Sequence, residues 1–327
     1  MFLHRKLRCS CSSQNRILFG GLLGFLATIS AIAFAHAHGL AGNRLFPGTF
    51  AFDDPAVMDE FALSMLSRKH PATDGSRVTD STVNWSFQRL LTPNITIGVD
   101  SGYIRRNWES GWRSGFDTTS LTLKALLYKN DPHEMLISTG LSWGIGGSGA
   151  RGVGAGRPDT IQPGLFFGKG FGDLPDSLAW LRPFAITGAV GATLPMSANS
   201  TILGFDRATG LLTPTLSPNV EILHWGFSIQ YSTYYLTSRF TGGPPKAEPL
   251  RQLIPLIEFA FDSPKGQKTV PTMNPGFVYV ADTYQVGVEA VLPLSSEAGR
   301  NVGVKAQLLL FTDDLFPSLF GKPLLSR

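Results

Sequence analysis

His224 is the side chain of this sequence whose type and position could support acid–base chemistry. It lies in the apolar run 222–225, directly after Glu221, whereas His133 lies in a turn and His70 in a loop. Serines are plentiful, but no set of partners with the spacing of a hydrolytic triad accompanies them. A single histidine within a strand is more often a hydrogen-bonded structural residue than a general base. We therefore predict that the protein is not an enzyme.

A second candidate is the glycine-rich stretch 147–156, which resembles a loop that cradles phosphate groups. No helical pattern follows it, it has no Lys-Ser or Lys-Thr pair, and Pro158 comes two residues after it. A phosphate-binding loop requires a following helix and a Lys-Ser or Lys-Thr pair. We predict an external loop here, and no cofactor.

The third candidate is a metal site at His36-Ala37-His38. Cleavage of a leader after Ala35 would give a free amine, two amides and a third-position histidine, a nitrogen set suited to Cu(II) or Ni(II). Cleavage after Ala37 would remove it. Since both histidines simply flank the cleavage sites, we predict no metal and keep His36 and His38 as a subordinate hypothesis.

Residues 1–37 have the features of a secretory signal peptide. A basic start precedes the apolar stretch 17–34, and two small-x-small exits follow. Four of the 28 lysines and arginines lie in this leader, so 24 remain to balance 24 acidic residues, and nucleic acid is not an implied partner. Both cysteines, Cys9 and Cys11, also lie in the leader, which excludes a disulfide framework from the mature chain.

The elements that must position these side chains are alternating strands. In residues 134–146, apolar side chains occupy one face and small or polar ones the other. Repetition of this pattern behind an export signal is typical of barrels in the bacterial outer membrane. The predicted fold is all-β, a transmembrane antiparallel up-and-down β-barrel of about twelve strands, with ten or fourteen also compatible. The expected strands are 57–66, 78–91, 94–105, 117–129, 134–146, 160–171, 180–194, 217–236, 250–262, 274–281, 284–294 and 301–311.

These strands define four regions of the chain. We predict a signal peptide at 1–37, a periplasmic N-terminal extension at 38–56, the barrel at 57–312 and a C-terminal tail at 313–327. Short connections alternate with longer ones along most of the chain. Because outer-membrane barrels keep short turns on the periplasmic side, both termini are expected in the periplasm.

Counting by twos from the apolar positions assigns charged side chains to the inner face. They are Asp100, Lys124, Glu258, Glu289 and Lys305, accompanied by Gln285 and Gln307. A basic side chain facing lipid at the membrane midplane costs about 2–4 kcal/mol, so these charges must line water or pair with one another. An open pore and a filled interior both remain compatible. If the last hairpin turns at 295–300, Glu289 faces Lys305 directly.

Other residues suggest contacts outside the lumen. Basic residues at the loop ends could attract anionic solutes or lipopolysaccharide phosphates, or could simply be solvated; they are Arg105, Arg106, Arg113, Arg151 and Arg157. Interfacial aromatic belts are expected from Trp85, Trp143, Trp180, Trp225, Tyr231, Tyr234 and Tyr235. The predicted partners are outer-membrane lipids, lipopolysaccharide, small-molecule solutes and the barrel insertion machinery.

Two stretches resemble a known group of barrels. Residues 274–293 (NPGFVYVADTYQVGVEAVLP) resemble the penultimate hairpin of the porin-like proteins classed with the MetA pathway of phenol degradation, and the ending 303–317 (GVKAQLLLFTDDLFP) resembles this group as well. The resemblance implies a transporter-like barrel and brings no catalytic residues. Such barrels often end on an aromatic residue, whereas sixteen residues follow Phe311 here. Either Phe311 closes the barrel, or Phe316 and Phe320 extend the last strand.

Together these patterns favour passive passage of small solutes, hydrophobic or aromatic ones among them, across the outer membrane. A membrane-embedded lipid-modifying enzyme and a non-conducting structural barrel remain as alternatives. The sequence does not identify the solute, because selectivity depends on lumen width and on the folding of loops.

Overall fold

The structure is a computed structural model that describes residues 39–71, 77–108, 111–206, 211–236 and 252–325. The predicted signal peptide and the His36–His38 metal hypothesis lie outside these residues. None of the helices in the described ranges is both long and apolar enough to span a bilayer.

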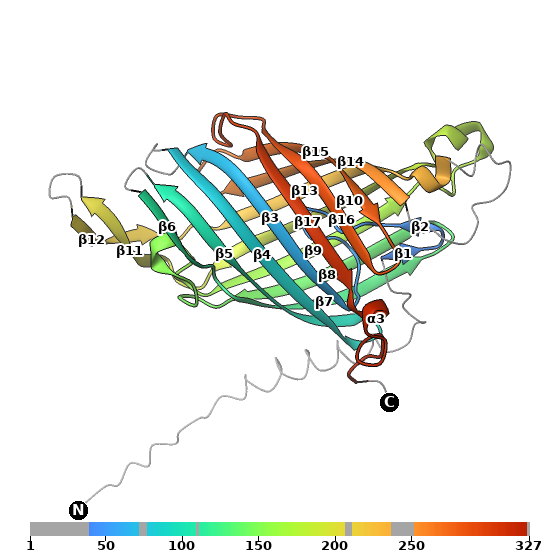
Figure 1. The fold of residues 1–327 in the computed structure, drawn as a ribbon, viewed down its shortest axis with the longest axis horizontal. Helices are drawn as coiled ribbons and strands as arrows, with labels where there is room; N and C mark the ends of the chain where they lie inside the picture. The colour runs from blue at the N-terminus through green and yellow to red at the C-terminus, as the bar shows by residue number, and fades with distance from the viewer. Residues whose placement is uncertain (1–38, 72–76, 109–110, 207–210, 237–251, 326–327) are drawn as a thin grey trace, which may run out of the picture. The chain divides into compact units, whose positions relative to one another are not determined.

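A closed antiparallel β-barrel forms the body of the protein (Figure 1). Each strand pairs with its neighbour along the barrel, and β17 pairs with β3 to close the ring. The strands β6 and β7 both pair with β5, one after the other, and so share one position in the ring. The barrel therefore has twelve strand positions, as predicted. Its strands are β3 (Glu60–Pro71), β4 (Arg77–Thr92), β5 (Ile95–Trp108), β6 (Gly111–Phe116), β7 (Ser120–Asn130), β8 (Met135–Gly144), β9 (Thr160–Gly170), β10 (Phe184–Pro195), β13 (Ile222–Tyr231), β14 (Gln252–Pro264), β15 (Val270–Val280), β16 (Tyr284–Pro293) and β17 (Gly303–Phe311).

The outer wall of the barrel is apolar. Along β7 and β8, the exposed side chains include Leu121, Leu123, Leu141 and Trp143, which alternate with inward-facing polar or small residues. A bulge between Leu126 and Tyr128 interrupts this alternation. A closed barrel satisfies all its backbone hydrogen bonds internally, and an apolar exterior suits lipid rather than water. This architecture places the protein in the bacterial outer membrane.

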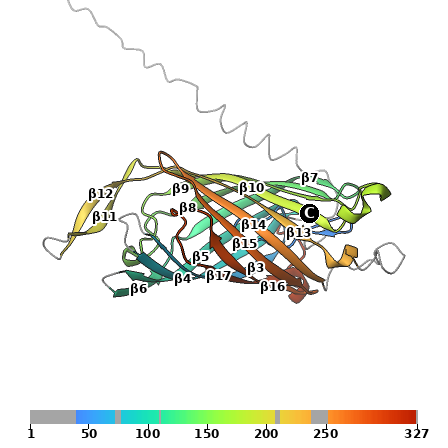
Figure 2. The ribbon, with the colours of Figure 1, turned by 90° about the horizontal axis from the view of Figure 1, so that it is seen from above.

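The two ends of the barrel differ. The end that we call the turn end carries the tight connections 93–94, 131–134 and 281–283, the start of β3 and the end of β17. The opposite loop end carries the hairpin of β11 (Asn199–Asp206) and β12 (Leu211–Pro218), which projects beyond the barrel (Figure 2). It also carries the short helix η1 (Arg151–Val153) within the glycine-rich loop. The prediction of one strand over 217–236 was wrong, because β12 ends at Pro218 and β13 begins at Ile222.

Residues 39–59, which we call the N-terminal segment, lie inside the barrel. They include the small hairpin of β1 (Leu40–Ala41) and β2 (Arg44–Leu45). Their apolar side chains form a core with inward-facing residues of β14, β15 and β17: Leu45, Phe50, Ala56, Met58, Ile254, Leu256, Val278, Val280, Leu309 and Phe311. The predicted periplasmic extension over 38–56 thus lies, from residue 39 onward, inside the barrel. These apolar residues are buried better against the inner wall than they would be in water.

Candidate functional site

The N-terminal segment enters the barrel and leaves it at the turn end. Near its start, the Gly42 amide donates to Asp131 Oδ1 at 2.8 Å, in a connection at that end. Near its finish, Asp59 accepts from the Leu90 amide at 2.5 Å, close to the β4–β5 turn. Phe50 and Asp53 contact side chains in the middle of the strands instead, at Glu258 and Lys124. The segment thus reaches to mid-barrel and folds back, occupying the lumen from one side.

Arg44 anchors the base of the segment. Its guanidinium lies 3.2 Å from the Glu134 carboxylate and donates to the Pro183 carbonyl at 3.1 Å. It also lies over the ring of Tyr235, whose hydroxyl donates to Glu134. Tyr235 is thus buried inside, and its predicted place in an aromatic belt was wrong. Removing one partner of such a buried pair costs about 3–5 kcal/mol, so this end is firmly held.

Two inward-facing glutamines bind the backbone of the segment. The Gln285 amide accepts from the Gly48 N–H at 3.0 Å and donates to the Gly48 carbonyl at 2.9 Å. Gln307 Nε2 donates to the Thr49 carbonyl at 3.2 Å. These side chains face inward as counted from the sequence, but they bind a protein segment rather than line open water.

Two of the predicted charged residues bind the next part of the segment. Glu258 accepts hydrogen bonds from the amides of Phe50 at 3.0 Å and Ala51 at 2.7 Å. The Lys305 ammonium donates to the Phe50 carbonyl. Hydrogen bonds to charged groups contribute about 1.5–3 kcal/mol each, roughly twice the value of neutral ones. The hydrogen bonds of Glu258 and Lys305 are therefore a major part of what holds residues 48–51 in the lumen.

Inward-facing glycines make room for the aromatic rings of the segment. A side chain at Gly168 of β9 would place its Cβ 3.0 Å from the ring of Phe46. At Gly287 of β16, the Cβ would lie 2.7 Å from the ring of Phe50. These glycines thus leave space for specific aromatic rings, and the sequence alone does not show which glycine accommodates which ring.

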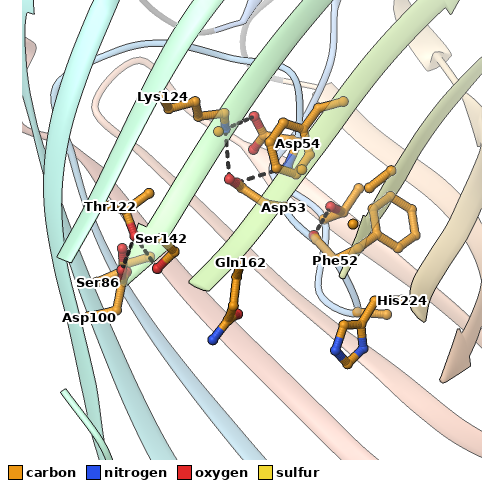
Figure 3. Close-up of a pocket in the computed structure, with 18 of the residues that line it drawn as sticks. Phe52, Asp53, Asp54, Ser86, Asp100, Thr122, Lys124, Ser142, Gln162 and His224 are labelled. Carbon is orange, nitrogen blue, oxygen red and sulfur yellow. Dashed lines mark hydrogen bonds and ion pairs between the residues drawn. The ribbon is translucent and has the colours of Figure 1, made fainter. Parts of the chain in front are cut away.

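Lys124 holds the tip of the segment. Its ammonium lies 2.9 Å from Asp53 Oδ2 and 3.9 Å from Asp54 Oδ1, and 5.0 Å from the ring centroid of Phe166 (Figure 3). The side chain of Lys124 is only 1% exposed. A buried ammonium needs such partners, because desolvation of an unpaired charge is costly.

A cavity of about 630 Å³ lies beside this tip, and its lining runs from Glu60 near the turn end to Asp117 and Asp262 near the loop end. Phe52, Asp53 and Asp54 of the segment line it together with residues of the wall (Figure 3). On that wall, Asp100 accepts from Thr122 Oγ1 at 2.9 Å, and Thr122 contacts Ser142 Oγ at 2.9 Å. Among the described residues that line the cavity, the basic ones are Lys124 and His224, and the acidic ones are Asp53, Asp54, Glu60, Asp100, Asp117 and Asp262. The ionisable groups that line the cavity are therefore predominantly acidic.

The predicted inner-face charges thus fall into two groups. Asp100 and Lys124 line the cavity, whereas Glu258 and Lys305 bind the segment. Glu289 faces Lys305 across the β16–β17 pair, which confirms the predicted register. Its carboxylate is buried and interacts electrostatically with both Glu258 and Lys305.

His224 also faces the lumen. Its Nε2 lies 2.8 Å from Thr193 Oγ1, and its Nδ1 lies 2.7 Å from Asp262 Oδ1. The order of hydroxyl, imidazole and carboxylate is that of a hydrolytic triad, and the sequence alone did not associate these three residues. The row lies on the inner wall of three adjacent strands, so the acyl chains of membrane lipids do not reach it.

A second pattern with a catalytic appearance is explained by the fold. Residues 140–144 (Gly-Leu-Ser-Trp-Gly) match the spacing of a nucleophile elbow, which requires a sharp turn between a strand and a helix. Here they lie within the regular strand β8, and Ser142 contacts Thr122. No group of three or more His, Cys, Asp or Glu side chains in the described ranges is arranged to hold a metal ion.

One of the basic residues predicted at the loop end is part of an internal network. Arg106 donates to Asp80 at 2.6 and 2.8 Å and to the Val153 carbonyl of η1 at 2.7 Å. His70 lies 2.9 Å from the same Asp80 carboxylate. Arg106 thereby ties the glycine-rich loop to the barrel rim, and is not a solvated loop charge.

No protein-family model matches this sequence, and no curated protein matches it. Solved structures with a similar fold are outer-membrane barrels. The COG4313 outer membrane channel from Pseudomonas putida F1 aligns over 82% of this chain and 99% of its own, with a TM-score of 0.49 and 11% identity. The KdgM porin aligns over 77% and 98%, with a TM-score of 0.42 and 10% identity. The beta domain of the Bordetella autotransporter BrkA aligns over 78% and 98%, with a TM-score of 0.48 and 12% identity.

The tip of the segment is expected to respond to pH. Burial, together with the neighbouring Asp53, raises the pKa of Asp54 to about 6, although Lys124 acts in the opposite direction. We call the segment docked when it occupies the lumen. A carboxyl whose pKa is higher in the docked state stabilises that state when the carboxyl is protonated. Docking should therefore be strongest below the ordinary pKa of aspartate, about 4, and weaken as the pH rises through the raised value.

We accordingly expect the full chain to conduct more in planar bilayers at about pH 8 than at about pH 5. Asp54→Asn should flatten this dependence, because the amide does not titrate. Equal conductance of the unaltered chain at both pH values would contradict a role of Asp54 in the pH response.

Proposed function

We propose that this protein is an outer-membrane channel for the passive passage of small solutes, and that its N-terminal segment closes the lumen. The observation that supports this most strongly is the cavity beside the segment tip. A purely structural barrel has no need of a cavity lined by ionisable groups, whereas a channel that a segment closes at one level retains an open cavity beside that segment. Besides its apolar contacts, the segment is joined to the wall through hydrogen bonds and ion pairs, which water can replace upon release.

The orientation follows from the two ends. Outer-membrane barrels keep tight turns in the periplasm and longer loops outside. The turn end is therefore proposed to face the periplasm, so that the segment enters from that side and the cavity opens toward the exterior. Lipopolysaccharide would then surround the loop end.

The lining suggests which solutes the cavity accepts. Its volume lies within the range of about 300–1,000 Å³ that is typical of small-molecule sites. Phe52 and Phe166 supply aromatic surface, and Thr122, Ser142 and Gln162 supply hydrogen-bonding groups. The proposed solutes are small aromatic molecules with polar substituents, neutral or cationic rather than anionic because the lining is acidic. This agrees with the resemblance to the transporters of the MetA phenol-degradation type.

Solute flux into liposomes tests the proposal. Swelling assays would compare benzyl alcohol, benzylamine and benzoate, which share a ring and differ in charge. We expect benzyl alcohol and benzylamine to enter faster than benzoate. Absence of flux for both the full chain and a variant without residues 39–56 would support the structural barrel instead.

The lipid-modifying alternative depends on His224. Since its row with Thr193 and Asp262 faces the lumen, we expect no lipid turnover from the full chain in lipid vesicles. The variant His224→Ala should behave in the same way. Turnover that is abolished in His224→Ala would favour the enzyme.

A further inference from the structure

The C-terminal tail leaves the barrel at Phe311 and does not continue the last strand. A single helical turn, α3 (Thr312–Leu315), follows β17 directly, so the extension of the strand through Phe316 and Phe320 was wrong. The residues beyond α3 expose large apolar side chains. The exposed fractions are 53% for Phe316, 68% for Leu319, 59% for Leu324 and 64% for Leu325. Exposed apolar residues gathered in one short segment indicate a binding surface.

The tail lies against the lipid-facing side of β4. The ring of Phe320 packs edge-on against Phe87 at 6.0 Å between centroids. Phe87 shares its strand face with Val83, which is exposed on the outer wall. The amides of Leu324 and Leu325 donate to the carbonyls of Leu90 and Leu91 at 3.0 and 2.9 Å. The exposed apolar surface of the tail is therefore continuous with the apolar outer wall of the barrel.

Arg89 and Asp59 hold the tail in this position. The Arg89 guanidinium donates to the carbonyls of Leu319 and Lys322, both at 2.9 Å, and lies over the ring of Phe320. It also pairs with Asp59, which accepts from the Gly321 amide at 2.8 Å. The tail is thus a fixed element, and its exposed side chains point outward from a defined backbone.

We propose that residues 312–325 form a foot that inserts its apolar side chains into the membrane interface around the turn end. Lipid is the occupant that fits, because the surface continues the wall that lipid already covers. The charged residues of the tail flank the apolar ones, with Asp313 and Asp314 before Phe316 and Lys322 before Leu324. Apolar side chains in the acyl boundary and charged ones among the headgroups are the arrangement of interfacial segments.

Spin labelling tests this directly. In a background of Cys9→Ser and Cys11→Ser, the chain has no other cysteine, so Leu319→Cys and Leu324→Cys accept one nitroxide each. In phosphatidylethanolamine–phosphatidylglycerol vesicles, both labels should collide more with oxygen than with a water-soluble nickel chelate. Leu141→Cys on the barrel wall gives the lipid reference, and Glu297→Cys in a loop gives the aqueous one.

Two outcomes would overturn the proposal. Greater collision with nickel than with oxygen at Leu319 and Leu324 would place the foot in water. Protection from both reagents at these sites would show that protein, a second copy or another chain, covers the surface. Because both substitutions replace exposed side chains, folding is retained, and the lipid reference verifies insertion independently of any channel activity.

Discussion

Deleting residues 39–56 should convert the barrel from a closed state to one with steady single-channel steps. The deletion removes the residues that meet Gln285, Glu258, Lys305 and Lys124 inside the lumen. Water can then hydrate these four side chains, and the cavity continues to the turn end. Planar-bilayer recordings of the full chain and the deletion variant at equal protein density measure the effect.

A single substitution separates loss of the hydrogen bonds to the segment from damage to the whole barrel. Glu258→Ala removes the acceptor of two amide hydrogen bonds, each worth about 1.5–3 kcal/mol because the acceptor is charged. Since about 1.4 kcal/mol corresponds to a factor of ten in an equilibrium constant, the open population should rise at least tenfold. We expect brief openings in Glu258→Ala and sustained ones in the deletion.

The matched control removes a comparable length of chain elsewhere. The β11–β12 hairpin, residues 199–218, pairs only with itself in the sheet arrangement of the described residues. Its deletion should leave the conductance of the full chain unchanged. A deletion of 39–56 that conducts no more than the full chain would show that the segment does not close the lumen.

The sequence predicted the barrel because alternation reports which face of a strand meets lipid. Leu121 and Leu123 on one side of Lys124 were enough to turn that lysine inward, and the same count placed Glu289 opposite Lys305. Alternation does not report what fills the interior. A polar or small inner face is compatible with water and with another piece of the chain.

The site was therefore only partly predictable. Glu258 and Lys305 were assigned to the correct face, but their partner is the backbone at Phe50, and backbone groups leave no mark in a sequence. Phe46 and Phe50 were visible as apolar residues ahead of the first strand. The glycines that accommodate them, Gly168 and Gly287, lie more than a hundred residues away and are recognised only in three dimensions.

Reversing the charge at Lys305 should give the second large effect, on stability. In Lys305→Glu, a third carboxylate joins Glu258 and Glu289 in a buried space, and the Phe50 carbonyl loses its donor. Removing one partner from a buried ionic cluster costs about 3–5 kcal/mol, and the added repulsion acts in the same direction. The temperature at which the folded band shifts on a gel should fall clearly, and openings should appear in bilayers.

Glu289→Lys in the same molecule should restore part of the loss. The double variant returns an ammonium to the cluster on the opposite strand, directly across from position 305. Recovery should remain incomplete, because the new ammonium starts from a different strand and is not placed to donate to the Phe50 carbonyl. Lys268→Glu is the surface control: its partner Glu297 is in an exposed loop, so the change should stay within about 0.5 kcal/mol. If the double variant is no more stable than Lys305→Glu alone, the two positions do not act on each other across the strand pair, and the inner-face cluster is held by the N-terminal segment rather than by its own charges.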